Sequence, residues 1–149
     1  MPRTAQDADV EIAARLLHDF NEEYGDPAPE LGALTARLRE LMGHDTAVAL
    51  ADDDLGVAVL RFRPNLWSAA LECYLAELYI VPGRRGQGLG RALLAHALDL
   101  ARERGADRIE LGTSEDDVAA RKLYTRMGFT RHEGTRPEDP IMYVYEREL

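Results

Sequence analysis

The fold is decided by one stretch of the sequence, Tyr79-Ile80-Val81-Pro82-Gly83-Arg84-Arg85-Gly86-Gln87-Gly88-Leu89-Gly90-Arg91-Ala92-Leu93-Leu94. An apolar run typical of a strand ends at a proline, a basic glycine-rich turn follows, and an apolar-periodic helix begins directly behind the turn. Glycines let the backbone adopt positive φ angles and approach a ligand closely. The first N–H groups of a helix lack intrahelical partners and attract anions. The stretch therefore predicts a phosphate site held mainly by main-chain amides.

The spacing of the glycines separates three kinds of phosphate-binding loop. The dinucleotide fingerprint G-x-G-x-x-G is incomplete, because Arg91 stands three residues after Gly88 where the third glycine belongs. A Walker A loop ends in Gly-Lys-Ser/Thr, and the only lysine in the chain is Lys122. The pattern that remains is R-x-x-G-x-G, from Arg85 to Gly90.

A second motif lies about thirty residues farther along, where Ala120 to Phe129 read A-x-x-L-Y-x-x-x-G-F. The two motifs, in this order, resemble the acetyl-CoA loop and the last motif of the GNAT superfamily of N-acetyltransferases, and the likeness covers roughly Thr46 to Phe129. The resemblance implies an α/β fold: a mixed sheet whose central strands splay apart, flanked by about four helices. It also implies acetyl-CoA in the cleft, as acetyl donor.

The bulk composition suits one ordinary globular domain. The 149 residues are 46% hydrophobic and 30% charged, so we expect a single GNAT-like domain over residues 1–149. The net charge of −9 argues against a nucleic-acid partner, and no apolar run approaches the roughly 20 residues that span a membrane. The single cysteine, Cys73, excludes a cysteine-cluster metal site. The four histidines also lack ligand spacing, so we expect no metal. With a single cysteine and an N-terminus that lacks the apolar core of a signal peptide, cytoplasmic residence is the default expectation.

Hydrophobic periodicity predicts the element order ααβββ(β)αβαββ. Helices are expected over residues 7–20, from Pro29 to Gly43, from the glycine turn to about Arg104, and behind a capping box-like Ser114–Asp117 pair. Strands are expected over Thr46–Ala51, Gly56–Arg63, Ala70–Val81, Arg108–Gly112, Phe129–Glu133 and Ile141–Glu148, with a turn at Asp52-Asp53-Asp54. The β-α-β order around the glycine turn implies a parallel strand pair, and hence a mixed sheet.

Acetyl transfer to an amine needs a proton acceptor, donors for the developing oxyanion, and a proton for the leaving thiolate. Tyr124 matches the tyrosine that lies near the CoA sulfur in many GNAT enzymes, so the resemblance makes it the acid. Glu77, four residues before Val81, is the favoured base. Because an ordinary carboxyl is a weak base for an ammonium, we expect it to act through water. Glu72, on the preceding strand, is the alternative.

Pro82 has no N–H, so the amides near Ile80 and Val81 are expected to point into the cleft rather than into a sheet ladder. By resemblance these amides hold the thioester carbonyl and the pantetheine arm. The pyrophosphate is assigned to the amides of the turn: Arg85, Gly86, Gln87, Gly88, Leu89, Gly90 and Arg91. Asp117 stands where many family members have asparagine. It is therefore either a CoA contact or only a helix N-terminal residue favoured by the dipole.

The acceptor is indicated by weaker signals. Residues 1–30 hold eight acids against two arginines, and in the family the two N-terminal helices wall the acceptor site. An acidic wall favours a small cationic amine such as a polyamine or an aminoglycoside, although a solvated helix face explains the acids equally well. The leading function is an amine N-acetyltransferase that works by direct attack in a ternary complex. The alternatives are a peptide or protein N-acetyltransferase and a non-catalytic acyl-CoA-binding module. Homodimer formation stays open.

Overall fold

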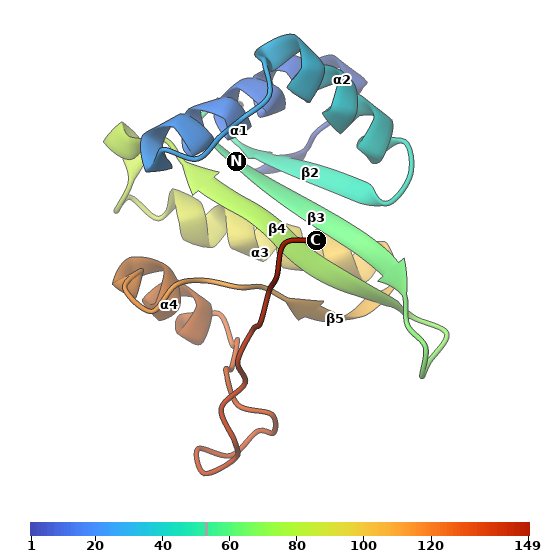
Figure 1. Ribbon diagram of the computed structural model, residues 1–149, viewed down its shortest axis with the longest axis vertical. Coiled ribbons are helices and arrows are strands. Elements are labelled where there is room, and N and C mark those ends of the chain that lie inside the picture. The colour runs from blue at the N-terminus through green and yellow to red at the C-terminus, as the bar shows by residue number, and fades with distance from the viewer. Residues whose placement is uncertain (53) are drawn as a thin grey trace. The chain divides into compact units, whose positions relative to one another are not determined.

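The structure is a computed structural model that describes residues 1–52 and 54–149, in two compact units, Met1–Leu111 and Gly112–Leu149. The first unit contains a five-stranded sheet with helices α1 to α3, and the second contains helix α4 (Figure 1). Asp53, in the expected turn after the first long strand, lies outside the described residues. The expectation of one domain over residues 1–149 stays a prediction.

The sheet has the order β1-β2-β3-β4-β5. Its strands are β1 (Arg3–Thr4), β2 (Thr46–Ala51), β3 (Gly56–Pro64), β4 (Leu71–Ile80) and β5 (Ala106–Glu110). The first three pairings are antiparallel, and β4 pairs with β5 in parallel. The predicted mixed sheet is thus confirmed, whereas the two-residue strand β1 is too short to give a periodic signal in the sequence.

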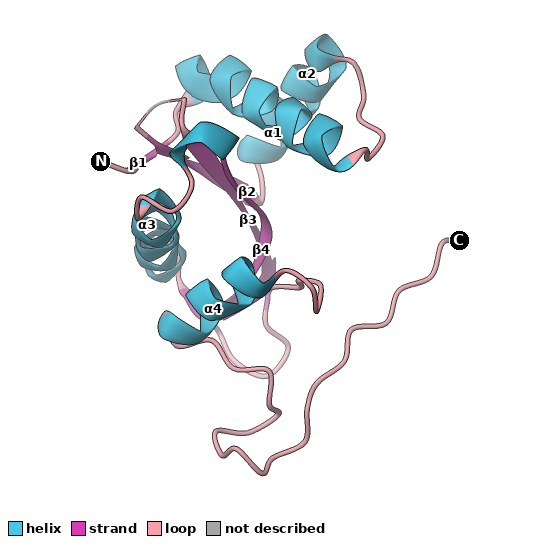
Figure 2. Cartoon of the chain, turned by 90° about the vertical axis from the view of Figure 1, so that its left-hand side faces the viewer, coloured by secondary structure: helices cyan, strands magenta, loops and turns pink. Residues whose placement is uncertain are grey.

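Helices cover both faces of the sheet. Helices α1 (Val10–Tyr24) and α2 (Leu31–Met42) pack on one face against Val48, Leu50, Val57 and Val59. Helix α3 (Leu89–Glu103) lies on the opposite side (Figure 2). Since side chains alternate along a strand, the α3 face of β2 consists of the small residues Ala47, Ala49 and Ala51, all buried.

A β-bulge divides β4 into two halves. Val59 pairs with Glu77, but the next residue of β3, Leu60, pairs with Leu75, so Ala76 is an extra residue on β4. A bulge of this kind re-aims the side chains that follow it. As a result Glu77 lies opposite Val59 on the face covered by α1 and α2, whereas Leu75 lies opposite Leu60 on the α3 face.

The strands β4 and β5 separate halfway along β4. The parallel pairing joins Leu71–Tyr74 to β5 and goes no farther among the described residues. Within the described part of the chain, the second half of β4, up to Ile80, therefore has β3 on one edge and no strand on the other. This is the splay that the family resemblance implied.

Several expected boundaries change in the structure. Helix α1 follows a short 3-10 turn at Asp7–Asp9 and continues to Tyr24, because Gly25 at φ +70° provides the left-handed C-cap. Helix α2 begins at Leu31 rather than at Pro29. None of the helices in the described ranges is long and apolar enough to cross a bilayer.

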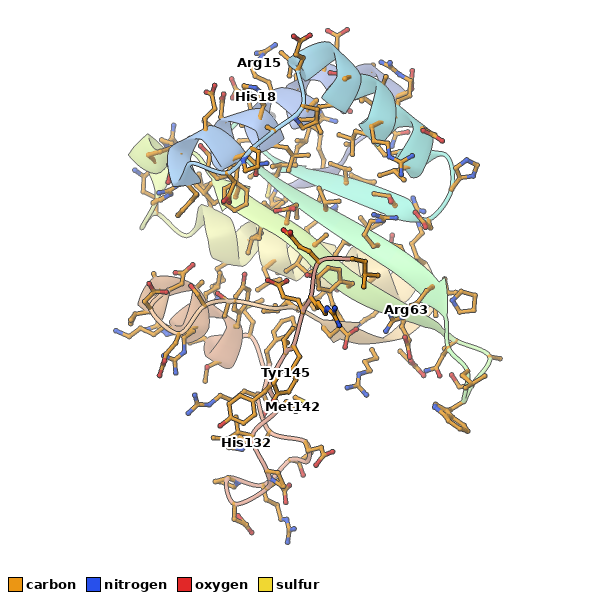
Figure 3. The ribbon with its side chains drawn as sticks, in the orientation of Figure 1. Arg15, His18, Arg63, His132, Met142 and Tyr145 are labelled. Atoms are coloured by element: carbon orange, nitrogen blue, oxygen red, sulfur yellow. The ribbon has the colours of Figure 1, made fainter. Side chains whose placement is uncertain are left out.

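In the second unit the prediction of two C-terminal strands, Phe129–Glu133 and Ile141–Glu148, is wrong. Only an isolated antiparallel bridge joins His132 to Ile141, with two backbone bonds flanking it, from Glu133 to Pro140 and from Met142 to Arg131. A short two-stranded ribbon is marginally stable by itself. The segment after the bridge, which carries Met142 and Tyr145 in Figure 3, has no ladder within this unit, and its side chains are exposed.

Candidate active site

The glycine turn forms a cradle of unpaired amides at the start of α3. Gly86 and Gly88 have φ angles of +75° and +85°, in the region where only glycine is unstrained. The first helical hydrogen bond runs from the Ala92 N–H to the Gly88 carbonyl at 3.1 Å. Across the described ranges, the amides that precede it, those of Leu89, Gly90 and Arg91, have no acceptor. Three free N–H groups at the positive end of a helix dipole fit a pyrophosphate.

The side chain of Arg85 serves the fold rather than this cradle. Its Nε donates to the Ile80 carbonyl and its Nη2 to Glu23, both at 2.9 Å. The guanidinium also lies 5.6 Å from the centre of the Tyr79 ring. These contacts fasten the turn to β4 and to α1. The Arg85 N–H, which was assigned to the pyrophosphate in the sequence analysis, instead donates to the Pro82 carbonyl at 3.4 Å within the turn.

The amide of Val81 is a correction to the sequence analysis. Its N–H donates to the carbonyl of Leu55 at 3.0 Å, and so continues the pairing of β4 with β3 instead of turning into the cleft. Because successive N–H groups of a strand point to opposite edges, the Ile80 N–H points toward the splayed side. Ile80 alone is therefore suited to hold a thioester carbonyl.

Glu77 lies in a pocket of about 200 Å³ between α1, α2 and the sheet. The bulge places Ala76 and Glu77 in the lining of the same pocket, although neighbours on a regular strand face opposite ways. Burial raises the pKa of the Glu77 carboxyl, and the charge of Asp26 adds to this rise. A carboxylate with a raised pKa is a stronger base than an ordinary one, and such shifts are typical of functional sites.

Glu72, the alternative base, lies on the same strand as Glu77 rather than on a preceding one, and it is held in an ion pair. Arg63 lies directly opposite it on β3 and donates from Nε to Glu72 Oε2 at 2.5 Å and from Nη2 to Glu110 at 3.3 Å (Figure 3). This network joins β3, β4 and β5 at the end where they are still paired. Glu72 is also absent from the pocket lining. Its arrangement indicates a structural role.

The second unit contains Tyr124 and Asp117. Asp117 is the N-cap of α4 (Val118–Arg126) and accepts a hydrogen bond from the Ala120 amide at 3.1 Å. The cap is thus Asp117 itself, and the expected capping box beginning at Ser114 does not form. Tyr124 is half-buried with its ring edge-on to Phe129 at 5.7 Å. Burial, and secondarily the charge of Asp117, raises the pKa of Tyr124, so its phenol stays protonated and able to donate at neutral pH.

Comparison with known proteins decides the family. The sequence profile described as "Acetyltransferase (GNAT) family" matches residues 12–129. The chain belongs to the GNAT family. It is 37% identical over 110 residues to a mycothiol acetyltransferase of Beutenbergia cavernae, covering 68% of this chain and 36% of that protein. It is 40% identical over 80 residues to a streptothricin acetyltransferase of Streptomyces lavendulae, covering 53% of this chain and 40% of that protein.

The solved structures agree with the GNAT fold. A presumed acetyltransferase from Arthrobacter sp. FB24 superposes with a TM-score of 0.88 at 43% identity, over 100% of this chain and 96% of the other. The two curated relatives are longer proteins, since this chain spans only 36% and 40% of their lengths.

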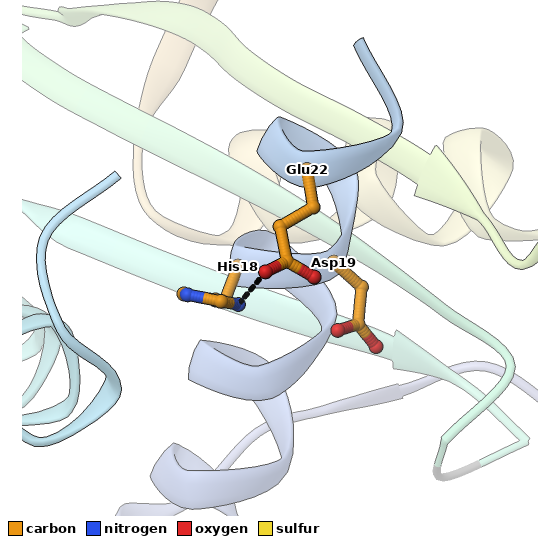
Figure 4. A group of neighbouring side chains, drawn as sticks. All are labelled: His18, Asp19 and Glu22. Atoms are coloured by element: carbon orange, nitrogen blue, oxygen red, sulfur yellow. Dashed lines mark ion pairs between the residues drawn. The ribbon is translucent and has the colours of Figure 1, made fainter. Parts of the chain in front are cut away.

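One acidic group on α1 lies outside the GNAT motifs. His18, Asp19 and Glu22 bring their ligand atoms within 4.8 Å of one another, although the histidines showed no ligand spacing in the sequence (Figure 4). His18 and Glu22 are one helical turn apart and form an ion pair at 3.9 Å. An i, i+4 pair on a helix surface accounts for this arrangement.

Two pocket residues were missed in the sequence, Arg37 on α2 and Arg61 on β3. A signal for Arg61 was present, because it continues the alternation of the buried Val57 and Val59. A charged residue in phase with core positions indicates a functional or paired side chain. No sequence signal marked the Ala76 bulge, on which the position of Glu77 depends.

Proposed function

We propose that this GNAT-family chain transfers the acetyl group of acetyl-CoA to the primary amine of a small molecule, by direct attack in a ternary complex. The proposal is carried by one observation. The strand that leads to the free-amide cradle also carries Glu77, a carboxyl of raised pKa that lines a pocket. The Ile80 N–H, which is suited to the thioester carbonyl, and the carboxyl of Glu77 thus lie on the same strand, β4.

Each residue then has a role that its surroundings support. The amides of Leu89, Gly90 and Arg91 bind the pyrophosphate, and acetyl-CoA supplies the activated acyl group. The Ile80 N–H polarises the thioester carbonyl. Glu77 accepts a proton from the amine, directly or through water, as the N–C bond forms and the C–S bond breaks. Tyr124 returns a proton to the thiolate, a role that rests on the resemblance of its motif.

The size and lining of the pocket favour a small acceptor. Its volume of about 200 Å³ is below the roughly 300–1,000 Å³ of pockets for drug-sized ligands. None of the eight acids of residues 1–30 lines it, and Asp7, Asp9 and Glu23 are already paired with Arg39, Arg3 and Arg85. Of these acids only Asp26 acts on the pocket, through the pKa of Glu77, so the support for a polycationic acceptor is slight. The names of the two curated relatives are in keeping with a small-molecule substrate.

The test measures release of the CoA thiol from acetyl-CoA with a panel of small amines. Glu72→Gln is the matched control for Glu77→Gln. Loss of a general base lowers kcat/KM by about 10²–10⁴-fold, so Glu77→Gln should lose this much and Glu72→Gln little. Tyr124→Phe should lower kcat more than it raises KM. Failure of every amine would favour the non-catalytic acyl-CoA-binding module, and turnover of peptides alone would favour the peptide N-acetyltransferase.

A further inference from the structure

The pocket beside Glu77 is lined by more positive than negative charge. Its charged lining residues are Arg37, Arg61 and Glu77, with Asn21 as a further polar group. The remaining lining is mostly apolar and comes from α1, α2, the loop between them and the sheet: Leu17, Pro29, Leu34, Leu38, Leu41, Val59 and Ala76. Two arginines in the lining of so small a pocket are unexpected in a chain of net charge −9.

The guanidinium of Arg61 is incompletely satisfied by the protein. Its Nη2 reaches Asp45 only at 3.3 and 3.4 Å, at the long end of the hydrogen-bond range. Its Nε is buried and has no acceptor among the described residues. Buried donors are nearly always paired in proteins, by protein, water or ligand. A small rotation of this side chain toward an anion in the pocket would therefore break only weak bonds.

Arg37 approaches the same pocket from α2. Its only recorded partner in the described ranges is Glu40, one helical turn away at 3.1 Å, and both side chains are more than 60% exposed. Exposed pairs of this kind are weak, so Arg37 is available to a ligand. Arg37 and Arg61 together offer the planar donors that suit a carboxylate.

The order of groups along the sheet gives the ligand a direction. Glu77 lies opposite Val59, and Arg61 is two residues farther along the same face of β3. Diagonal neighbours of this kind lie about 7–8 Å apart. Arg61 pairs with Tyr74, so it lies on the side of Glu77 that is farther from Ile80 and the glycine turn. An amine at Glu77 thus faces the donor end of β4, and an anionic group at Arg61 faces away from it.

We propose that the acceptor is a compact amino carboxylate, with its amine at Glu77 and its carboxylate bound by Arg61 and Arg37. The apolar residues of α1 and α2 contact the carbon skeleton between the two charged ends. Such a zwitterion carries no net charge, so the negative charge of the chain does not repel it. The inference rests on the proposed function for the fate of the amine, and on the pocket alone for the carboxylate.

The test pairs each amino acid with its amide, which keeps the amine and the side chain but removes the negative charge. A charged hydrogen bond contributes enough binding energy to change kcat/KM by about 10- to 100-fold. We expect the free acids to be preferred by this factor, mainly through KM. Arg61→Gln should abolish the preference, and Arg61→Lys should restore part of it. Arg39→Gln, which removes an exposed pair with Asp7 outside the pocket, should leave it unchanged.

A second readout, thermal stabilisation of the acetyl-CoA-free protein by leucine against leucinamide, separates the two proposals. Acetylation of amides as fast as acids overturns the carboxylate site while the acetyltransferase stands. A third outcome is that leucine but not leucinamide stabilises the protein, that this effect disappears in Arg61→Gln, and that no amine is acetylated. This outcome supports the carboxylate site and contradicts the proposed function. If the panel shows neither a preference for the acids nor stabilisation specific to the acids, the inference is overturned, and Nε of Arg61 is then satisfied by water alone.

Discussion

Substituting Gly88 tests whether the cradle binds by main chain. Gly88 is the N-cap of α3 at φ +85°, and a Cβ added there meets nothing within 4 Å. Gly105, at the other end of the same helix, also has a positive φ, of +91°, and open space around an added Cβ. Helix α3 runs from Leu89 to Glu103 between them, so these two glycines lie roughly 25 Å apart. Gly105→Ala is thus a matched control for Gly88→Ala.

The magnitudes follow from the two environments. An L-residue in the left-handed region costs about 1–2 kcal/mol, which in a chain of 149 residues lowers Tm by about 2–8 °C. Both variants should show this loss in a thermal melt. Gly88 is the residue at which the cradle of the Leu89, Gly90 and Arg91 amides begins, whereas Gly105 lies at the far end of the helix. Weakening a charge-assisted hydrogen bond there should reduce CoA affinity by about 10- to 100-fold.

Isothermal titration of CoA into both variants, at a temperature well below either melt, gives the answer. The reasoning fails if Gly88→Ala binds CoA as tightly as the parent chain. It also fails if Gly105→Ala loses as much affinity as Gly88→Ala, because a general loss of stability would then explain both.

Two further predictions concern titrating groups of the first unit. Hydrogen bonds from Arg3, and secondarily from the Gln6 amide, lower the pKa of Asp9 to about 2. Because the folded-state pKa is below the unfolded one, this carboxylate stabilises the fold above about pH 4 and stops doing so as pH falls through about 2. Denaturant unfolding should therefore show Asp9→Asn less stable than the parent at pH 7 but nearly equal at pH 2, whereas equal differences at both pH values would contradict the linkage. Burial raises the pKa of Cys73 to about 11, so at pH 8 its thiol should react with a maleimide at least about 100-fold more slowly in the folded chain than in urea; comparable rates would show that the strand opens readily.

The parts of the fold that the sequence predicted are those with strong local signals. The two strands of the hairpin, Thr46–Ala51 and Gly56–Pro64, are either wholly apolar or alternate between apolar and polar residues. Helix α3 lies between two glycines, Gly88 and Gly105. The prediction of C-terminal strands was wrong because it rested on the strand-like composition of Ile141–Glu148. A strand also needs the edge of another strand to pair with. Composition carries no information about that edge.

The candidate site divides in the same way. The cradle was predictable, because glycine spacing and a helix start determine its geometry locally. The pocket was not, because it depends on a one-residue register change at Ala76 and on Arg61, which is brought to Glu77 by pairing between strands. The predicted direction of the Val81 N–H was wrong for a related reason, since the adjacent proline does not prevent a hydrogen bond from this N–H to the Leu55 carbonyl.

The extra residue in β4 also limits how this strand can change over evolutionary time. Odd-numbered residues face α3 before Ala76, as Cys73 and Leu75 do, and face α1 and α2 after it, as Glu77 and Tyr79 do. Removing Ala76 would leave Leu75 and Glu77 adjacent on a regular strand, where neighbours face opposite sides, so both would keep their faces. Deleting another residue near the bulge would turn one half of the strand over, so that either Glu77 would lie beneath α3 or residues such as Cys73 and Leu75 would leave that core. We therefore expect β4 to tolerate loss of Ala76 but to exclude other single-residue insertions and deletions, whereas the loop from Asn65 to Ala70, on the same hairpin, can vary in length.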